Sequence, residues 1–193
     1  MKICLDPGHG NPRDPGAVNY GRLPVASDDV SEADLAWCVT EDLTTELEAL
    51  GFEVLVTRKE WEFLTPGERA RVANRWGADL LVSIHCNAAD NVQARGFEII
   101  HDDRSDVSRR FAQTVADQVR YSFPDVIFRG VKPDAETPRK HLSVLELASM
   151  PAILVEAGFI SNNQDLDWLL EHGLELARAL ADGIQLYADR IHT

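Results

Sequence analysis

The most constraining feature of this sequence is its opening, where an apolar run at residues 2–5 stops abruptly at Asp-Pro-Gly-His-Gly, residues 6–10. The apolar run predicts a β-strand. The proline cannot donate to a sheet ladder, and the two glycines tolerate backbone angles that other residues avoid. We therefore expect a strand that enters a tight turn and displays the imidazole of His9. A histidine in that place can bind a metal or move a proton, although the segment could also be only a polar turn.

The rest of the chain alternates between apolar runs and segments with helical periodicity. The expected strands are residues 2–5, 52–57, 79–84, 96–101, 143–147 and 152–156. The expected helices are residues 31–50, capped by Ser31 or Asp29, then 66–76, 105–123 and 161–192, the last capped by Ser161 and broken near Gly173. Residues 11–31 and 124–141 are expected to be loop or irregular. This alternation predicts a single α/β domain with a twisted, mostly parallel six-stranded sheet and helices on both faces.

Composition limits the class of protein. A length of 193 residues suits one domain, and we expect residues 1–193 to form it with no separate binding domain. The net charge of −13 argues against nucleic acid or an anionic membrane as the main partner. No apolar run is long enough for a membrane span, and no basic start precedes an apolar segment as in a signal peptide. We expect a monomer.

The cysteines do not form a disulfide framework. There are three, Cys4, Cys38 and Cys86, an odd number at wide and irregular spacing. Cys4 and Cys38 lie in apolar patterns and are predicted to be core thiols. This usage favours synthesis in a reducing compartment.

Three expected strands end near a group that could do chemistry: His9, His85 and Glu156. The carboxyl ends of parallel strands share one edge of a sheet, where α/β proteins place their sites. Two imidazoles and a carboxylate could bind zinc with one position open to water. The alternatives are that His85 is a hydrogen-bonded core histidine and that Glu156 pairs with a nearby helix or loop.

Several motifs, taken in order along the chain, carry a resemblance to a known family. They are LDPGHG (5–10), DPGAV (14–18), VTR (56–58), ERARVAN (68–74), ADLLVSIHCNAA (78–89), RGFE (95–98), RGVK (129–132) and MPAILVEAGFISN (150–162). Together they resemble the zinc-dependent N-acetylmuramoyl-L-alanine amidases of the amidase-3 type, over nearly the whole chain.

The resemblance implies roles for four residues. His9, Glu32 and His85 match the three zinc ligands of the family, and Glu156 matches its catalytic glutamate. Asp28 or Asp29 remains an alternative ligand to Glu32, whose carboxylate in a first helical turn could instead serve only the helix dipole.

Other residues near these motifs are candidates for supporting roles. Glu98 could orient a ligating imidazole, touch substrate or be structural, and Asn87 could do the same or only cap its loop. Residues 132–141 are expected to form part of the cleft wall, where Lys140 and His141 could contact substrate or lie in a solvated loop. Cys86 could be a fourth ligand, but a strand directs neighbouring side chains to opposite faces. Glu146 stands where the family often carries a basic residue.

The activity implied by the resemblance is hydrolysis of the amide bond between N-acetylmuramic acid and L-alanine in peptidoglycan. We expect a lytic enzyme made in the cytoplasm without a signal peptide that acts on the cell wall after release, like an endolysin or a mother-cell autolysin. Two other interpretations stay open. One is a zinc carboxypeptidase acting on wall peptides, and the other is an inactive peptidoglycan-binding module.

Overall fold

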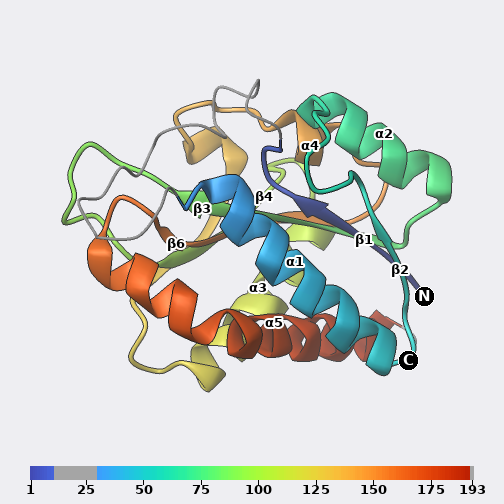
Figure 1. Ribbon diagram of the computed structural model, residues 1–193. Coiled ribbons are helices and arrows are strands. Elements are labelled where there is room, and N and C mark those ends of the chain that lie inside the picture. Colours follow the sequence, from blue (N-terminus) through green and yellow to red (C-terminus); the bar gives the residue numbers. More distant parts are fainter. Residues whose placement is uncertain (11–29, 192–193) are drawn as a thin grey trace.

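A six-stranded sheet forms the centre of the protein (Figure 1). The computed structural model describes residues 1–10 and 30–191. The strands are β1 (Lys2–Pro7), β2 (Glu53–Val56), β3 (Leu80–Asn87), β4 (Phe97–His101), β5 (Phe128–Pro133) and β6 (Ala152–Phe159). Their order is β2-β1-β3-β6-β4-β5, and every neighbouring pair is parallel except β4 and β6. The mostly parallel α/β sheet predicted from the sequence is confirmed.

Helices cover both faces of this sheet (Figure 1). They are α1 (Glu32–Ala49), α2 (Pro66–Trp76), α3 (Asp106–Ser122), α4 (Ser143–Glu146) and α5 (Asn163–Ile191), with a short 3-10 turn at Asp134–Glu136. Helices α1, α3 and α5 pack on one face around the larger apolar core. Helices α2 and α4 cover part of the other face around a smaller core. Among the described helices, none combines the length and apolar character needed to cross a bilayer.

Helix α1 begins where the sequence pattern places it. Ser31 accepts a hydrogen bond from the Asp34 backbone, and the Asp34 side chain accepts one from Ser31, so both form a capping box. Leu35, Val39 and further apolar residues at helical spacing are buried against the sheet. The cap and this face together fix Glu32 in the first turn, close to the sheet's carboxyl edge.

The predicted number of strands is correct, but one predicted strand is wrong. Residues 143–147 contain helix α4, whose Val144 and Leu145 are buried, because a short apolar run fits either structure. The sixth strand is β5, inside the segment that we expected to be irregular. Its sequence FRGVKP lacks the usual alternation and ends in a proline, which an edge strand tolerates.

Two strands extend beyond their predicted ends. β3 continues to Asn87 and β6 to Phe159, so His85 lies within a strand rather than after it, and Glu156 lies inside its strand rather than at the end. The two residues are direct partners in the parallel ladder. The sheet itself therefore sets their spacing.

Three smaller expectations also have outcomes. The cap of α5 is Asn162, whose side chain accepts from the Gln164 and Asp165 backbones, whereas Ser161 accepts from Ala89. The predicted break in α5 is confirmed, since His172 has non-helical angles. Cys38 is exposed on α1, so its assignment to the core is wrong.

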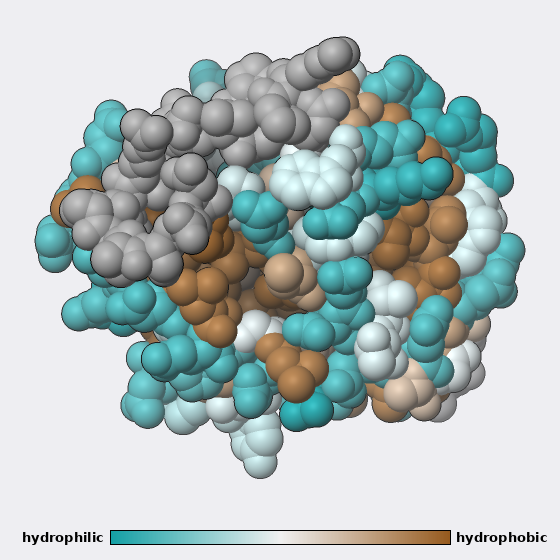
Figure 2. Space-filling view, viewed as in Figure 1, coloured by the Kyte–Doolittle hydropathy of each residue, from teal (hydrophilic) through white to brown (hydrophobic). Residues whose placement is uncertain are grey.

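The outer face over α1 and α5 carries no broad apolar surface. Figure 2 shows small brown groups separated by larger teal areas on this side of the molecule. A cluster of polar side chains lies instead at the carboxyl edge of the sheet, and it includes His9, Glu32 and His85.

Candidate metal centre

Strand alternation directs a row of polar side chains to the face that α2 and α4 partly cover. On β3, Val82, Ile84 and Cys86 belong to the larger core, so Ser83 and His85 face the opposite side. The same alternation on β6 places Glu156 on the side of Leu154, which packs in the smaller core. Cys86 points away from the imidazoles.

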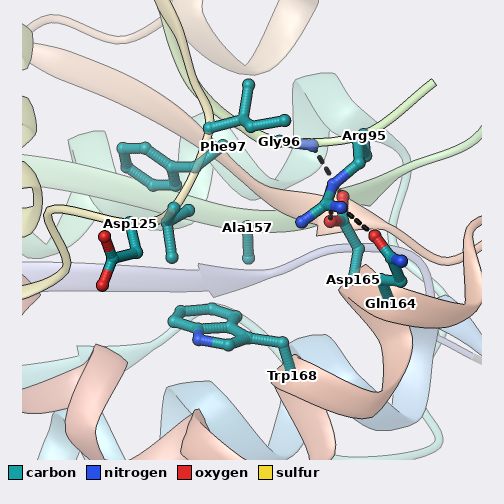
Figure 3. Close-up of a pocket in the computed structure, with 10 residues that line it drawn as sticks. Arg95, Gly96, Phe97, Asp125, Ala157, Gln164, Asp165 and Trp168 are labelled. Atoms are coloured by element: carbon teal, nitrogen blue, oxygen red, sulfur yellow. Dashed lines mark hydrogen bonds and ion pairs between the residues drawn. The ribbon is translucent and has the colours of Figure 1, made fainter.

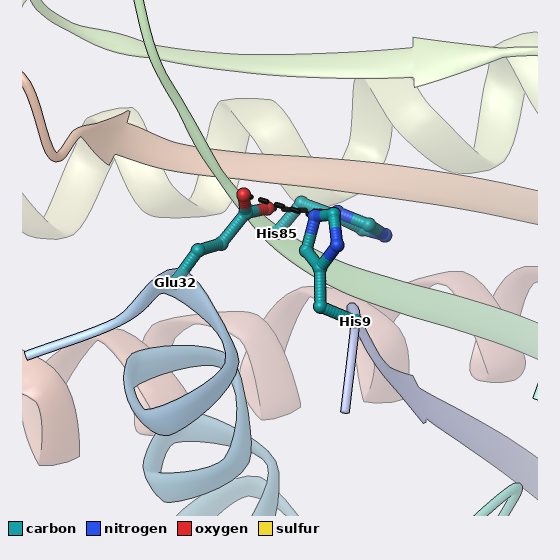
Figure 4. Close-up of side chains that lie close together, drawn as sticks. All are labelled: His9, Glu32 and His85. Carbon is teal, nitrogen blue, oxygen red and sulfur yellow. Dashed lines mark hydrogen bonds and ion pairs between the residues drawn. The ribbon is translucent and has the colours of Figure 1, made fainter. Parts of the chain in front are cut away.

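Three side chains from distant parts of the chain meet at this edge (Figure 4). His9 follows β1, Glu32 lies in the first turn of α1, and His85 lies on β3. Glu32 Oε2 is 2.9 Å from His9 Nε2, and Glu32 Oε1 is 2.9 Å from His85 Nδ1. One potential ligand atom from each residue lies within 4.8 Å of the others. We define these three residues as the His-Glu-His cluster.

The electrostatics of Glu32 favour its ionised form. Burial alone would raise the pKa of this carboxyl, but hydrogen bonds to His85 and His9 and their charges outweigh burial and lower the pKa to about 2. The backbone N–H of Cys86 also donates to Glu32 Oε1 at 3.1 Å. Glu32 therefore stays a carboxylate at every pH at which the protein would work.

Glu156 has the opposite electrostatics. Burial raises the pKa of the Glu156 carboxyl well above its usual range, and the charges of Glu32 and Glu98 act in the same direction, while Arg139 opposes them. Its Oε2 atom is buried without a hydrogen-bond partner in the part of the chain that the structure describes. A carboxyl group that holds a proton so readily, beside His85, is suited to proton transfer.

The donor set of the His-Glu-His cluster fits a divalent metal. Two imidazole nitrogens and a carboxylate oxygen are the ligands that catalytic zinc sites use, with one position left for water. Glu156 is the ladder partner of His85, and its buried Oε2 atom has no hydrogen-bond partner among the described residues. A water in the open position would supply that hydrogen bond. Glu156 is therefore placed beside the cluster and not within it.

The turn that carries His9 is held by two buried arginines. Arg58 donates from Nε to the Pro7 carbonyl at 3.0 Å and from Nη2 to the Gly8 carbonyl at 2.9 Å. Arg69 donates to the carbonyls of Pro7 and His9. His9 itself has a φ of 57°, in the left-handed region that non-glycine residues rarely adopt. The arginine contacts therefore stabilise a backbone conformation that costs energy on its own.

The carboxylate of Asp6 neutralises part of the positive charge of the two buried arginines. Its carboxylate is fully buried and accepts from Thr57 Oγ1 at 2.5 Å, from Ser83 Oγ at 2.7 Å and from Arg69 Nη1 at 3.0 Å. A buried charge with this many partners is stable only if all are kept. Asp6 and Arg69 therefore connect β1, β2, β3 and α2 beneath the His9 turn.

Gly8 is required by close packing. A Cβ atom at this position would lie 2.6 Å from the His85 ring and 2.8 Å from the Ile84 carbonyl. The absence of a side chain lets the turn approach His85 directly, which brings the two imidazole ring centres to 5.2 Å.

The remaining candidate residues lie around the cluster. Glu98, the ladder partner of Glu156 on β4, accepts from Asn87 Nδ2, Arg129 Nε and Lys132 Nζ. Within the described residues Glu98 makes no hydrogen bond to an imidazole, so the geometry favours its structural role. Asn87 links Glu98 to the start of the following loop, since its Oδ1 accepts from the Ala88 backbone at 2.9 Å.

A groove of about 340 Å³ opens beside the cluster. His9 and His85 lie on its wall together with His141, so His141 is placed where a substrate would pass. Phe63 and Arg139 also line it, and the sequence analysis singled out neither. Glu146 does not line the groove but pairs with Arg104 at 3.1 Å.

A second, smaller pocket of about 140 Å³ lies on the other face of the sheet, next to Trp168 (Figure 3). Asp165, Arg95 and Gln164 at one end of this pocket are bonded to one another or to nearby backbone groups. Asp165 accepts from the backbones of Gly96 and Phe159, while Arg95 contacts both Asp165 and Gln164. We assign the chemistry to the groove because His9 and His85 of the His-Glu-His cluster line it.

Sequence reasoning missed the residues that hold the site together: Asp6, Arg58 and Arg69. A signal was present for Arg69, which lies four residues before the buried Ala73 and so occupies an apolar-face position of α2. Arg58 directly follows a strand. The alternative ligands Asp28 and Asp29 lie outside the described residues.

Comparison with known proteins finds a family model, relatives and a solved structure that share one description. The family model described as Amidase_3, N-acetylmuramoyl-L-alanine amidase, matches residues 3–186. The sporulation-specific N-acetylmuramoyl-L-alanine amidase of Bacillus subtilis is 32% identical over 188 residues, which cover 96% of this chain and 67% of that protein. N-acetylmuramoyl-L-alanine amidase CwlM of Mycobacterium tuberculosis is 29% identical, over 99% of this chain but 45% of its own length.

A solved structure extends the similarity to three dimensions. The crystal structure of N-acetylmuramoyl-L-alanine amidase from Clostridium difficile 630 superposes with a TM-score of 0.86 at 29% identity. The match covers 97% of this chain and 96% of that one. The present chain thus spans that chain almost entirely, but only about half of the M. tuberculosis relative.

The first prediction concerns Arg69. Arg69→Lys keeps the charge but replaces the planar guanidinium, whose three nitrogens reach acceptors on Leu64, Asp6, Pro7 and His9, with one ammonium nitrogen. We expect Zn²⁺ affinity, measured by competition with a chromophoric chelator, to fall about 10–100-fold, as when partners behind metal ligands are lost. Arg75→Lys, exposed on the same helix, is the matched control and should bind as the wild type does. Equal affinities for the two variants would contradict the positioning role.

The second prediction concerns Glu156 in metal-free protein. Because its folded-state pKa is raised above the unfolded value of about 4.3, the native state loses stability as pH rises above that value. Glu156→Gln cannot ionise, so its melting temperature should exceed that of the wild type at pH 8. The difference should vanish below pH ~4.

Thermal unfolding of metal-depleted samples between pH 4 and 8 measures this effect. The exposed Glu175→Gln on α5 is the control, and its melting curve should follow the wild type. A Glu156→Gln protein that is less stable than the wild type at pH 8 would show that the buried carboxylate is satisfied after all.

Proposed function

The chain belongs to the Amidase_3 family of N-acetylmuramoyl-L-alanine amidases, and we propose that it is a zinc-dependent hydrolase that cleaves the amide bond between N-acetylmuramic acid and L-alanine in peptidoglycan. The observation that carries the proposal is the meeting of His9, Glu32 and His85 beside Glu156, at the end of an open groove. The sporulation-specific relative supports a cell-wall substrate.

We assign His9, Glu32 and His85 to the metal and Glu156 to catalysis. An unactivated amide is a poor electrophile, and zinc bound by these residues would supply Lewis-acid polarisation of the carbonyl and a more acidic water. The arrangement of the cluster supports this choice because its donors are two nitrogens and one oxygen. The ligating imidazoles must be neutral, so activity falls in acid.

Glu156 acts as the general base and then as the general acid. Its carboxylate takes a proton from the attacking water while the water oxygen forms a bond to the amide carbon. When the carbon–nitrogen bond breaks, the carboxyl group gives that proton to the departing amine of L-alanine. The raised pKa of Glu156 suits both halves of this exchange, since a group that accepts a proton must also hold it until the amine leaves.

The chain's own residues favour this activity over the two other interpretations. A binding module that had lost catalysis has no need of Glu156 with a buried, unpartnered oxygen beside the cluster. A carboxypeptidase on the same scaffold would use the same metal, so the bond that is cut decides between the two. As in the sequence analysis, we propose that the protein reaches the cell wall after release from the cytoplasm and acts as a monomer.

The proposed function predicts the products of the reaction. Incubation of purified peptidoglycan with the zinc-loaded protein should release peptides with a new amino terminus at L-alanine and leave a free lactyl carboxylate on the glycan. Mass spectrometry of the soluble products, with labelling of free amino groups, measures both. Released D-alanine without a new L-alanine terminus would support the carboxypeptidase and contradict the amidase.

Two controls belong to this experiment. Chelation of the metal should stop the release, and added Zn²⁺ should restore it. Glu156→Gln should retain its zinc but lose almost all turnover, because it removes the proton acceptor and leaves the ligands in place. Chelator-insensitive cleavage, or near-normal cleavage by Glu156→Gln, would contradict the assigned roles.

A further inference from the structure

The loop that follows β5 is fixed in place by a buried carboxylate. Asp134 is fully buried, and its two oxygens accept from the backbones of Asp103 and Leu142, each at 3.1 Å. Thr137 folds back onto the Asp134 carbonyl with its backbone N–H at 3.0 Å. Both ends of residues 134–142 are therefore tied to the body of the protein, and the residues at the tip have defined positions.

The tip of this loop presents basic side chains to the groove. Lys140 has a φ of 60°, which turns the chain sharply, and the His141 backbone donates to the Arg139 carbonyl at 2.7 Å. Arg139 and His141 then line the same groove as His9 and His85, whereas Lys140 does not. Arg139 and His141, on either side of the sharp turn, therefore line the groove, and Lys140 between them lies outside it.

The Arg139 side chain differs from Arg69, Arg129 and Lys132 because no protein group is bonded to its guanidinium in the part of the chain that the structure describes. Arg69 also lines the groove, but Asp6 and several carbonyls occupy its guanidinium. Arg129 and Lys132 are both bonded to Glu98. Within residues 1–10 and 30–191, the guanidinium of Arg139 makes no hydrogen bond or ion pair, and its charge acts on Glu156 without a direct bond. Its guanidinium is therefore available to a ligand.

The chemistry of such a ligand follows from the guanidinium. Arginine presents a planar fork of donors that matches a carboxylate, and charge-assisted bonds of this type are among the stronger polar contacts. The protein has a net charge of −13, so an anionic ligand needs a local cation to enter the groove. A peptide that leaves from the proposed scissile amide ends in a carboxylate, so the substrate offers an anion of the kind that a guanidinium binds.

We propose that Arg139 binds a carboxylate on the peptide side of the scissile amide and so determines which peptides the groove accepts. This inference rests on the proposed amidase function. It places the peptide along the loop of residues 134–142 and leaves the glycan on the opposite side of the His-Glu-His cluster.

The test compares two synthetic substrates and two variants. One substrate is N-acetylmuramoyl-L-alanyl-D-glutamate, and the other is the same molecule with both glutamate carboxylates converted to carboxamides. Arg139→Gln should lower kcat/KM for the first substrate about tenfold, mainly through KM, and leave kcat/KM for the carboxamide within about twofold of the wild-type value. Arg139→Lys should fall between, since it keeps the charge but not the planar fork.

Lys140→Gln is the matched control. It removes the same charge one residue away, outside the groove, and should leave the preference for the carboxylate substrate unchanged. If both Arg139→Gln and Lys140→Gln lose the preference for the carboxylate substrate, the preference depends on the net charge of the loop and not on a contact with Arg139. That result would overturn the assignment of Arg139. An equal loss on both substrates in Arg139→Gln, or no loss, would also overturn it while the amidase function stands. If the wild-type protein cleaves neither substrate at the L-alanine amide, the proposed function fails, and the inference fails with it.

Discussion

The interaction on which this structure depends is the pair of contacts that Glu32 makes with His9 and His85. A carboxylate and two imidazoles can meet only if the turn after β1, the first turn of α1 and the carboxyl-terminal part of β3 converge to within hydrogen-bond distance. The capping box of Ser31 and Asp34 places Glu32. The ladder that pairs β1 with β3 and β3 with β6 places the other groups at one edge.

Much of the buried polar structure supports this convergence. Arg58 and Arg69 hold the carbonyls of the His9 turn, and Asp6 balances the charge of Arg69 while it bonds Thr57 and Ser83. Such a network stabilises the protein only when complete, because each buried charge depends on its partners. The same network keeps His9 in a left-handed conformation that an isolated turn would leave.

Two glutamates near the cluster have environments that push their pKa values apart. Hydrogen bonds and charge from two imidazoles keep Glu32 ionised, whereas burial and neighbouring carboxylates favour the protonated form of Glu156. Opposite shifts of this kind allow two residues of the same type to take different roles, and they support the proposed roles of Glu32 as a ligand and Glu156 as a proton carrier. The assignment of roles to Glu32 and Glu156 therefore has a physical basis beyond the family resemblance.

The sequence predicted the α/β class because strand, helix and cap signals are local. The predicted strand ends singled out His9, His85 and Glu156, whereas Glu32 came from the family resemblance. The sequence analysis missed strand β5 and assigned the residues of helix α4 to a strand. Both segments are short, and the structure of a short segment depends on the residues that it packs against. The sequence analysis also missed Arg58, Arg69 and Arg139, whose roles depend on loops and strands distant in sequence. Polar partners across a fold have no periodicity, so only the structure brings them together.

The central claim is that His9, Glu32 and His85 hold one metal ion beside Glu156. Crystals of the zinc-loaded protein, measured on both sides of the zinc absorption edge, test it directly. The account predicts one strong anomalous peak within about 2.0–2.2 Å of a nitrogen of each histidine and an oxygen of Glu32, with Glu156 outside the coordination sphere. A peak elsewhere, or the two imidazoles turned away from the peak, would contradict it.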